Sequence, residues 1–303
     1  MIGIDFQDFT IEYQHINKTR TAVISGYKGS NGEITVPSTV HNTPVTGIGD
    51  FAFKRLAGLR SVVLPEGVVT IGEYAFEKCT GLTNIVLPEG LASIKKSAFA
   101  GCTGLRGVAF PLSLTGIGAN AFSRCTGITS VSLPQNVSVI GEQAFEKCRL
   151  SEITVAEENQ FFSSIEGVLF DKTGISLIWY PKGRQNDAYS IPEHTAYIGD
   201  WAFEGCRVIK SITLPKRLVA IGNYAFAECG IADITFPEGL TSIKNRAFYR
   251  CARFTKLALP RSLGSVGEYA FADCLNLETV ELSRNVKIGH GAFHGAPAQL
   301  VYR

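Results

Sequence analysis

The sequence lacks the short motifs that mark the common classes of enzyme. It contains no G-x-S-x-G nucleophile turn, no P-loop and no H-E-x-x-H metal motif, and its Ile-Gly pairs never extend to G-x-G-x-x-G. It also contains no C-x-x-C pair of the kind that binds zinc. Among the five histidines, His290 and His294 are four residues apart, but no third ligand is close in sequence. We therefore predict neither an enzyme nor a site for a metal or a cofactor.

Long apolar runs and an excess of charge of either sign are absent as well. No stretch approaches the roughly 18 apolar residues that a transmembrane helix needs, so no membrane insertion is predicted. Lys and Arg number 29 against 27 Asp and Glu, which gives no electrostatic reason to expect nucleic acid as a partner. Residues 1–14 are acidic and lack the basic and apolar regions of a signal peptide. Either the protein is intracellular or the sequence is part of a longer secreted chain.

What the sequence does contain is one phrase repeated along most of its length. The phrase is I-G-x-x-A-F-x-x-C, and it uses every one of the eight cysteines. With small variations, its copies lie at residues 71–79, 94–102, 117–125, 140–148, 198–206, 221–229, 243–251 and 266–274. Two flanking copies, at 48–56 and 288–296, have Leu56 and Ala296 in place of the cysteine. The phenylalanine recurs every 22 or 23 residues apart from one gap, and a fixed period of this length is typical of a solenoid of stacked coils.

The cysteine position accepts Cys, Leu or Ala, which is the behaviour of a small apolar position in a core. We therefore predict that the cysteines are buried free thiols. Coils about 4.8 Å apart would also bring neighbouring cysteines within the Cα range of a disulfide. Pairing of some of the cysteines therefore stays open as an alternative.

One coil can be followed in residues 82–104. Residues 82–87 have the L-x-x-I-x-L spacing of a short half-buried strand, which Pro88 ends because proline cannot donate to a ladder. The apolar residues of A-F-x-x-C share a face if residues 95–102 form one or two helical turns. Consecutive coils run in the same direction, so their strands should pair in parallel and in register. The sequence thus predicts a parallel β-sheet on one face and short helical turns on the other.

The two ends and the gap in the period depart from the repeat. Residues 9–14 and 21–27 alternate polar and apolar around a turn, which is typical of a hairpin that caps a solenoid. Residues 167–181, with D-K-T-G at the turn, predict a second hairpin in place of one Ala-Phe turn. We expect one solenoid over residues 1–303, composed of an N-terminal hairpin cap (1–32), repeats (33–155), an inserted hairpin (156–187), further repeats (188–293) and a C-terminal cap (294–303) whose last strand is 299–302.

The full phrase, L-x-x-I-x-L-P-x-x-L-x-x-I-G-x-x-A-F-x-x-C, resembles the BspA-like bacterial surface leucine-rich repeat, and the resemblance covers nearly the whole chain. Residues 21–53 are similar to the opening of that family, and residues 161–183 are similar to its recurrent inserted hairpin. The resemblance implies an α/β fold in the form of a right-handed leucine-rich-repeat solenoid. It also implies a bacterial protein that is secreted or at the cell surface, with a role in adhesion or protein binding.

Two groups of residues are candidates for contact with a partner. The first is the outward row of the predicted strands, which is small and mixed in character: Val63, Val86, Ala109, Ser132 and Thr154. Solenoids bind on such extended faces, but the same row can be ordinary solvated sheet. The second is Trp179 and Tyr180 of the inserted hairpin, which either protrude or seal the flank of the solenoid. Trp201 shares its place in the repeat with several aromatic residues, which predicts a discontinuous aromatic stripe on the convex side.

These observations favour a non-enzymatic binding or adhesion module whose partner is a protein or a glycan. The alternative is a rigid spacer that holds other domains of a larger surface protein away from a cell wall. The absence of enzyme motifs leaves catalysis as the least supported of the three hypotheses.

Overall fold

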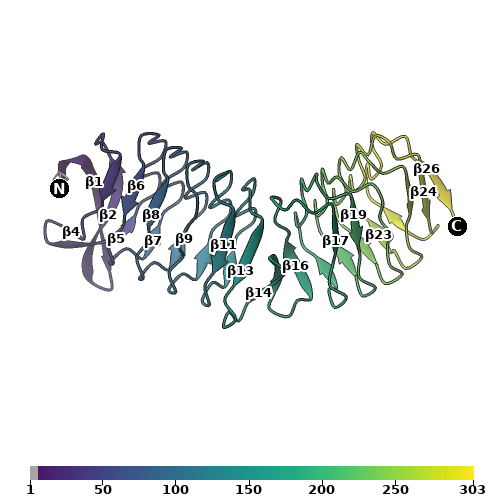
Figure 1. The fold of residues 1–303 in the computed structure, drawn as a ribbon, viewed down its shortest axis with the longest axis horizontal. Helices are drawn as coiled ribbons and strands as arrows, with labels where there is room; N and C mark the ends of the chain where they lie inside the picture. The colour runs from purple at the N-terminus through teal and green to yellow at the C-terminus, as the bar shows by residue number, and fades with distance from the viewer. Residues whose placement is uncertain (1–5) are drawn as a thin grey trace. The chain divides into compact units, whose positions relative to one another are not determined.

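The computed structural model describes residues 6–303 and consists of short strands joined by turns (Figure 1). The chain forms two compact units, Met1–Phe161 and Phe162–Arg303. Each unit is a stack of coils, as the repeat predicts. Apart from the three-residue 3-10 helix η1 (Phe6–Asp8), residues 6–303 contain no helix. The predicted helical turns are therefore absent.

The first unit opens with an antiparallel hairpin, as the alternation of polar and apolar residues predicts. Strands β1 (Phe9–Ile16) and β2 (Thr19–Tyr27) pair over their whole length. Asn17 and Lys18 form the turn with φ angles of 48° and 67°, and positive φ at both residues is what this two-residue hairpin turn requires. β2 then pairs in parallel with β5 (Thr43–Ile48), so the hairpin is continuous with the first coil.

The longer of two parallel ladders in the first unit consists of two-residue strands. Each strand ends at the isoleucine that opens the repeated phrase, and Ile71 lies opposite Ile94 in the ladder. The ladder continues from β5 through β7 (Thr70–Ile71), β9 (Ser93–Ile94), β10 (Gly116–Ile117) and β12 (Val139–Ile140). β4 (Thr39–Val40) pairs antiparallel with β5 beside it.

The predicted L-x-x-I-x-L strands form the second ladder of this unit, in register but with an interruption. One sheet contains β3 (Glu33–Thr35), β6 (Ser61–Val63) and β8 (Asn84–Val86), and another contains β11 (Ser130–Leu133) and β13 (Glu152–Val155). Residues 105–111, which lie between them in sequence, form no strand. Gly107 stands there at the place of Asn84 and Ser130, and glycine weakens a strand because it has no side chain to pack.

The second unit repeats this arrangement after an antiparallel meander. The meander contains β14 (Phe162–Ile165), β15 (Val168–Asp171) and β16 (Ser176–Trp179), of which β15 and β16 are the hairpin predicted around D-K-T-G. A parallel ladder then continues from β16 through β18 (Tyr197–Ile198), β20 (Ala220–Ile221), β21 (Ser242–Ile243), β23 (Ser265–Val266) and β25 (Lys287–Ile288).

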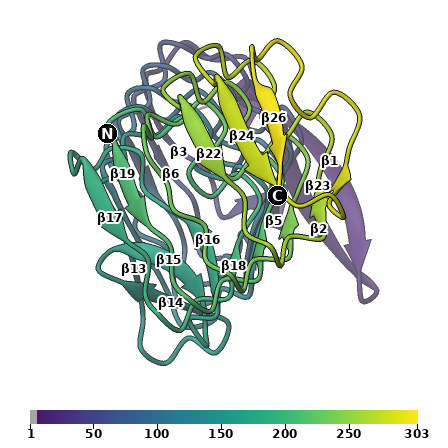
Figure 2. The ribbon, with the colours of Figure 1, turned by 90° about the vertical axis from the view of Figure 1, so that its right-hand side faces the viewer.

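The L-x-x-I-x-L strands of the second unit also form short parallel sheets. β17 (Ala188–Ser190) pairs with β19 (Ser211–Thr213), and β22 (Lys256–Ala258), β24 (Thr279–Leu282) and β26 (Gln299–Tyr302) lie side by side (Figure 2). β26 coincides with the last strand that the sequence predicts. Between the two sheets, residues 231–237 contribute an isolated bridge from Asp233 to Ser211.

The A-F-x-x-C segments are consecutive turns, so the prediction of helical turns is wrong. In residues 71–79, alternate backbone N–H groups donate within the turn and to the next coil. The Cys79 N–H donates to the Phe76 carbonyl, three residues earlier, at 3.1 Å. The Phe76 N–H instead donates to the Ala98 carbonyl of the next coil at 2.7 Å. The bonds to the next coil replace the i to i−4 bonds of an α-helix.

Two residues of each turn have a left-handed backbone, which a right-handed helix does not allow. In the coil just described they are Tyr74 and Lys78, with φ of 56° and 59°. Most of the equivalent residues are not glycine, and they include Phe51, Arg124, Trp201, Arg246 and Asp273. The tight turns that they close still direct Ala, Phe and Cys toward the core.

The phenylalanines form a column of stacked rings in the core of each unit. In the first unit, consecutive ring centroids from Phe53 to Phe145 are 4.8, 5.1, 5.1 and 5.5 Å apart, with planes parallel within 8°. In the second unit, the column starts with Tyr180 stacked on Phe203 at 4.9 Å and continues to Phe293. This spacing is close to the strand spacing of about 4.8 Å, so the rings and the ladders share one repeat distance.

All eight cysteines are buried free thiols, as their shared place in the repeat predicts. Six of them donate a hydrogen bond to the phenylalanine carbonyl of the preceding coil, as from Cys125 Sγ to Phe99 O at 3.1 Å. Burial raises the pKa of the Cys79, Cys229 and Cys274 thiols to about 12. The cysteine is therefore a small core group that also satisfies a backbone acceptor.

Truncation of the ring column and of the thiol column should destabilise the first unit to different extents. Phe122→Ala removes a buried ring between Phe99 and Phe145 and should lower the free energy of unfolding by about 3–5 kcal/mol. Cys125→Ala removes one sulfur atom and should cost about 1–2 kcal/mol. Urea denaturation followed by circular dichroism measures both, with the exposed Ser132→Ala as the control. Equal and negligible losses in both core variants would contradict this packing.

The raised thiol pKa values predict that the protein loses stability at high pH. A thiol of the unfolded chain ionises near pH 8.5 or so, whereas burial raises the pKa of Cys79, Cys229 and Cys274 to about 12. The folded state holds protons that the unfolded state releases, so the free energy of unfolding should fall as the pH rises from about 8.5 toward about 12.

Denaturant melts at about pH 7, 9 and 10.5 measure that fall, and Cys274→Ala should reduce its slope because one of the responsible thiols is gone. The same burial predicts that iodoacetamide modifies the thiols only in denaturant. Rapid modification of the native protein would disprove the assignment.

Candidate functional site

The first candidate set lies on the outward face of the strand ladder of the first unit. Val63 and Val86 are adjacent across β6 and β8 and are 37% and 46% exposed. Ser132 and Thr154 are adjacent across β11 and β13 and are also exposed, and Ala109 is exposed in the segment without a strand. The structure thus places Val63 next to Val86, and Ser132 next to Thr154. All five side chains are small and uncharged, so this face offers a partner no large anchor.

The second candidate set is divided between the surface and the core. Tyr180 is 1% exposed and stacks on Phe203, because it occupies the place of the core phenylalanine in its coil. The prediction that Tyr180 contacts a partner is therefore wrong, and its ring closes the end of the aromatic column. Trp179, the last residue of β16, is half-buried.

The second unit has a surface row formed by one side chain from each of four consecutive coils. Trp201, Tyr224, Arg246 and Tyr269 occupy the first left-handed position of their turns, with φ of 56°, 52°, 54° and 53°. The rings of Trp201 and Tyr224 stack with centroids 6.0 Å apart. The Arg246 guanidinium lies 5.5 Å from the Tyr224 centroid and 5.2 Å from the Tyr269 centroid. We call these four residues the aromatic–arginine row.

Arg246 makes this row continuous, where the sequence predicted a discontinuous stripe. A guanidinium is attracted to the face of an aromatic ring by the ring quadrupole, so Arg246 links Tyr224 to Tyr269. It also donates a hydrogen bond to the Tyr224 hydroxyl. The signal in the sequence was the common spacing of 22 or 23 residues, which Arg246 shares with the aromatic members.

The backbone beside the row is held by a ladder of side-chain hydrogen bonds. Asp200 accepts a bond from the Asn223 N–H at 2.7 Å, Asn223 from the Asn245 N–H at 3.2 Å, and Asn245 from the Glu268 N–H at 2.9 Å. Each of these residues immediately precedes a member of the row. A hollow of about 370 Å³ is lined by the four row residues together with Asn223, Asn245 and Glu268. The row is therefore a fixed surface with an opening beside it.

The first unit has a shorter counterpart of the row. The Phe51 and Tyr74 rings stack at 5.2 Å with planes 1° apart, and the Lys54 ammonium is 4.9 Å from the Phe51 centroid. Lys54 also pairs with Glu77 at 2.7 Å. The next three coils have the polar residues Ser97, Asn120 and Gln143 at this position. The aromatic patch of the first unit therefore ends after two coils.

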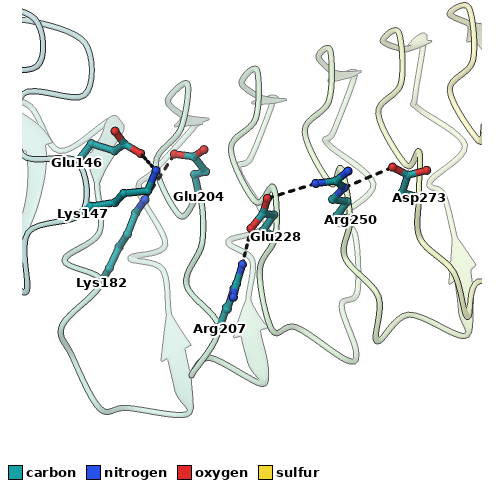
Figure 3. A network of polar contacts seen from close by, with 8 residues as sticks. All are labelled: Glu146, Lys147, Lys182, Glu204, Arg207, Glu228, Arg250 and Asp273. Carbon is teal, nitrogen blue, oxygen red and sulfur yellow. Dashed lines mark hydrogen bonds and ion pairs between the residues drawn. The ribbon is translucent and has the colours of Figure 1, made fainter. Parts of the chain in front are cut away.

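Charged side chains of successive coils form a chain of ion pairs on the second unit (Figure 3). Arg207 pairs with Glu228 at 2.5 Å, and Arg250 lies 3.9 Å from Glu228 and 3.4 Å from Asp273. The four side chains are between 34% and 76% exposed. Pairs as exposed as these contribute at most about 1 kcal/mol each, so their main effect is to shape the surface potential.

Within residues 6–303, no three His, Cys, Asp or Glu side chains come together in a way that could hold a metal ion. All eight thiols are buried, and burial raises the pKa of Cys206 and Cys251 well above the ordinary value of a thiol. Residues 6–303 also contain no helix with the length and apolar character needed to cross a membrane.

Parallel ladders of short strands, stacked phenylalanines and a period of 22 or 23 residues define a leucine-rich-repeat solenoid. The chain belongs to the family of the BspA type leucine-rich repeat region, whose sequence model matches residues 46–174 and 182–298. No curated protein sequence matches the chain.

Solved structures with the same fold come from several bacteria. The pneumococcal vaccine antigen PcpA is similar with a TM-score of 0.77 at 22% identity, over 98% of this chain and 87% of that chain. A leucine-rich cell surface protein from Faecalibacterium prausnitzii is similar with a TM-score of 0.60 at 25% identity, over 93% and 94%. A leucine-rich repeat protein from Bacteroides ovatus is similar with a TM-score of 0.63 at 20% identity, over 97% and 98%.

The aromatic–arginine row should contribute little to stability, because its side chains lie outside the core. Trp201→Ala and Tyr269→Ala each lose contacts worth about 0.5–1.5 kcal/mol. Phe203→Ala empties a core position in the same unit and should cost about 3–5 kcal/mol. Thermal melts of the three variants measure the difference. A loss in Trp201→Ala as large as that in Phe203→Ala would place the row in the core instead.

Proposed function

We propose that this protein is a non-enzymatic binding module of the bacterial cell surface, and that a protein partner docks on the aromatic–arginine row. The observation that carries the proposal is the contact of Trp201, Tyr224, Arg246 and Tyr269 in one row beside a hollow of about 370 Å³. Trp, Tyr and Arg are the residues that most often supply the binding energy of protein interfaces.

The rigidity of the row supports this role. Stacking already restricts the rotamers of Trp201, Tyr224 and Arg246 in the free protein. Binding therefore orders fewer side-chain torsions, and less conformational entropy is lost on association. The hydrogen-bond ladder through Asn223 and Asn245 fixes the backbone from which these side chains project.

The similar structures support a location outside the cell. One of them is described as a cell surface protein and another as a vaccine antigen. These descriptions support our proposal that this chain acts on the surface of a bacterium or among its secreted proteins. A partner there is a host matrix protein or a component of another cell, which makes adhesion the proposed outcome of binding.

The strand face of the first unit is proposed as a secondary contact. Val63 and Val86 form its apolar part, and the row continues with Ala109, Ser132 and Thr154. Because these side chains are small, they favour close approach of a flat partner surface over insertion into pockets. Their contribution to affinity should be smaller than that of the aromatic–arginine row.

Two other roles have weaker support. A glycan partner would stack its sugar rings on open aromatic faces, and the stacking of Trp201 on Tyr224 already occupies one face of each ring. A rigid spacer is consistent with the hydrogen bonds that join each coil to the next. A spacer role does not account for a continuous row of large side chains beside a hollow.

Biolayer interferometry against a panel of host matrix proteins and bacterial surface glycans tests the proposal. The wild-type chain should bind at least one protein of the panel, and Trp201→Ala or Arg246→Ala should weaken that binding by about tenfold or more. Leu275→Ala, which truncates an exposed apolar side chain of the same unit, is the control and should change binding by less than about twofold.

Absence of any partner above background would favour the spacer. An effect confined to Val63→Ala and Val86→Ala would move the contact to the strand face, and equal effects of Leu275→Ala and Trp201→Ala would refute a specific role for the row.

A further inference from the structure

One coil of the second unit is shorter than its neighbours, and a hollow lies over the shortened turn. The neighbouring coils have two residues between the cysteine and the next core residue, Arg207–Val208 and Ala252–Arg253, whereas the short coil has only Gly230. Gly230 lies so close to the preceding coil that a Cβ there would be 2.2 Å from the Arg207 carbonyl oxygen. The hollow measures about 430 Å³ and is lined by Arg207, Glu228, Cys229, Gly230, Arg250, Ala252 and Arg253. We call it the arginine hollow.

The lining of the arginine hollow has an excess of positive charge. It contains three guanidinium groups and one carboxylate, and that carboxylate, Glu228, is shared between Arg207 at 2.5 Å and Arg250 at 3.9 Å (Figure 3). Within residues 6–303, the Arg253 side chain has no ion pair or hydrogen bond. Arg250 also pairs with Asp273 at 3.4 Å, so Arg253 is the guanidinium of the lining whose five N–H donors are open to a ligand.

The floor of the hollow differs in character from its rim. Cys229 and Gly230 are buried beneath it and Ala252 stands beside them, so the floor has no hydroxyl or amide side chain. A floor without polar side chains can accommodate the methylene groups of a ligand. The guanidinium groups of the rim match a planar carboxylate, which arginine binds through two parallel N–H···O bonds. The hydroxyl groups of a sugar would find no side-chain partners on the floor.

We infer that the arginine hollow is a binding site for a glutamate or aspartate side chain in an acidic segment of a partner protein. The carboxylate bonds to Arg253, whose donors are unused, and is attracted by Arg207 on the opposite side of the shortened turn. The hollow has no residue in common with the aromatic–arginine row. The proposal for this site can therefore be tested independently of the function proposed for the row.

Fluorescence anisotropy with a labelled hexaglutamate peptide and the full chain tests this site at low ionic strength, where screening is weak. The wild-type chain should bind the peptide, and Arg253→Ala should weaken binding by about tenfold. Arg217→Ala removes the same charge from an exposed position of the same unit that does not line the hollow, and it should weaken binding by less than about twofold. Trp201→Ala should bind the peptide as the wild type does.

A second variant separates shape from charge. Ala252→Phe keeps every charge and fills the hollow, so it should weaken binding about as much as Arg253→Ala does. Circular dichroism establishes that each variant is folded, and if Ala252→Phe does not fold, the comparison of Arg253→Ala with Arg217→Ala decides alone.

Three results would overturn the inference. The first is no binding of hexaglutamate by the wild-type chain, and the second is an equal loss in Arg217→Ala and Arg253→Ala, which would indicate net charge alone. The third is tighter binding of heparin than of hexaglutamate, with the heparin binding lost in Arg253→Ala, which would assign the hollow to a sulfated glycan.

Discussion

The backbone hydrogen bonds between coils are the interaction on which the rest of this structure depends. In the two-residue ladder they run back to the preceding coil, as from the Gly72 N–H to the Ile48 carbonyl at 2.8 Å. In the Ala-Phe turns they run forward, as from the Phe53 N–H to the Ala75 carbonyl at 2.7 Å. Each coil is thus tied to its neighbours by two sets of bonds, and a shift in register would leave buried backbone groups of both sets without partners.

This register places equivalent residues of successive coils against each other, in the core and on the surface alike. In the core it produces the phenylalanine columns and the row of thiols. On the surface it produces the aromatic–arginine row and the hydrogen-bond ladder that starts at Asp200. The position of a residue within the repeat therefore decides whether it faces the core or the solvent. The residue types that occupy the same position in successive coils decide which interactions that row can make.

The coils, the parallel register, both hairpins and the burial of the thiols could be predicted because each follows from the spacing of residue types. The conformation of the turns could not be predicted. The segment A-F-x-x-C places its apolar residues on one face either in a helix or in consecutive turns that contain two left-handed residues. Glycine is the usual sign of a left-handed residue, and here it marks only a few coils, at Gly101, Gly205, Gly291 and Gly295. For Tyr180 the sequence left both a protruding ring and a ring that seals the flank open, because the long gap hides its place in the period. Arg246 was left out of the aromatic stripe because its residue type, unlike its position, differs from that of its neighbours.

The same constraint limits where a protein of this kind can acquire specificity. A change at a phenylalanine or cysteine position disturbs a column that neighbouring coils share, so the side chain there has to be one that the core accommodates. The left-handed positions accept residues as different as Ser97 and Trp201, because their side chains lie outside the columns while their backbone bonds remain. Loss of one residue at a turn, as at Gly230, opens a hollow without removing a core residue. Variation at these two kinds of place alters the surface at little cost to the fold, which is why the aromatic–arginine row and the arginine hollow both occur there.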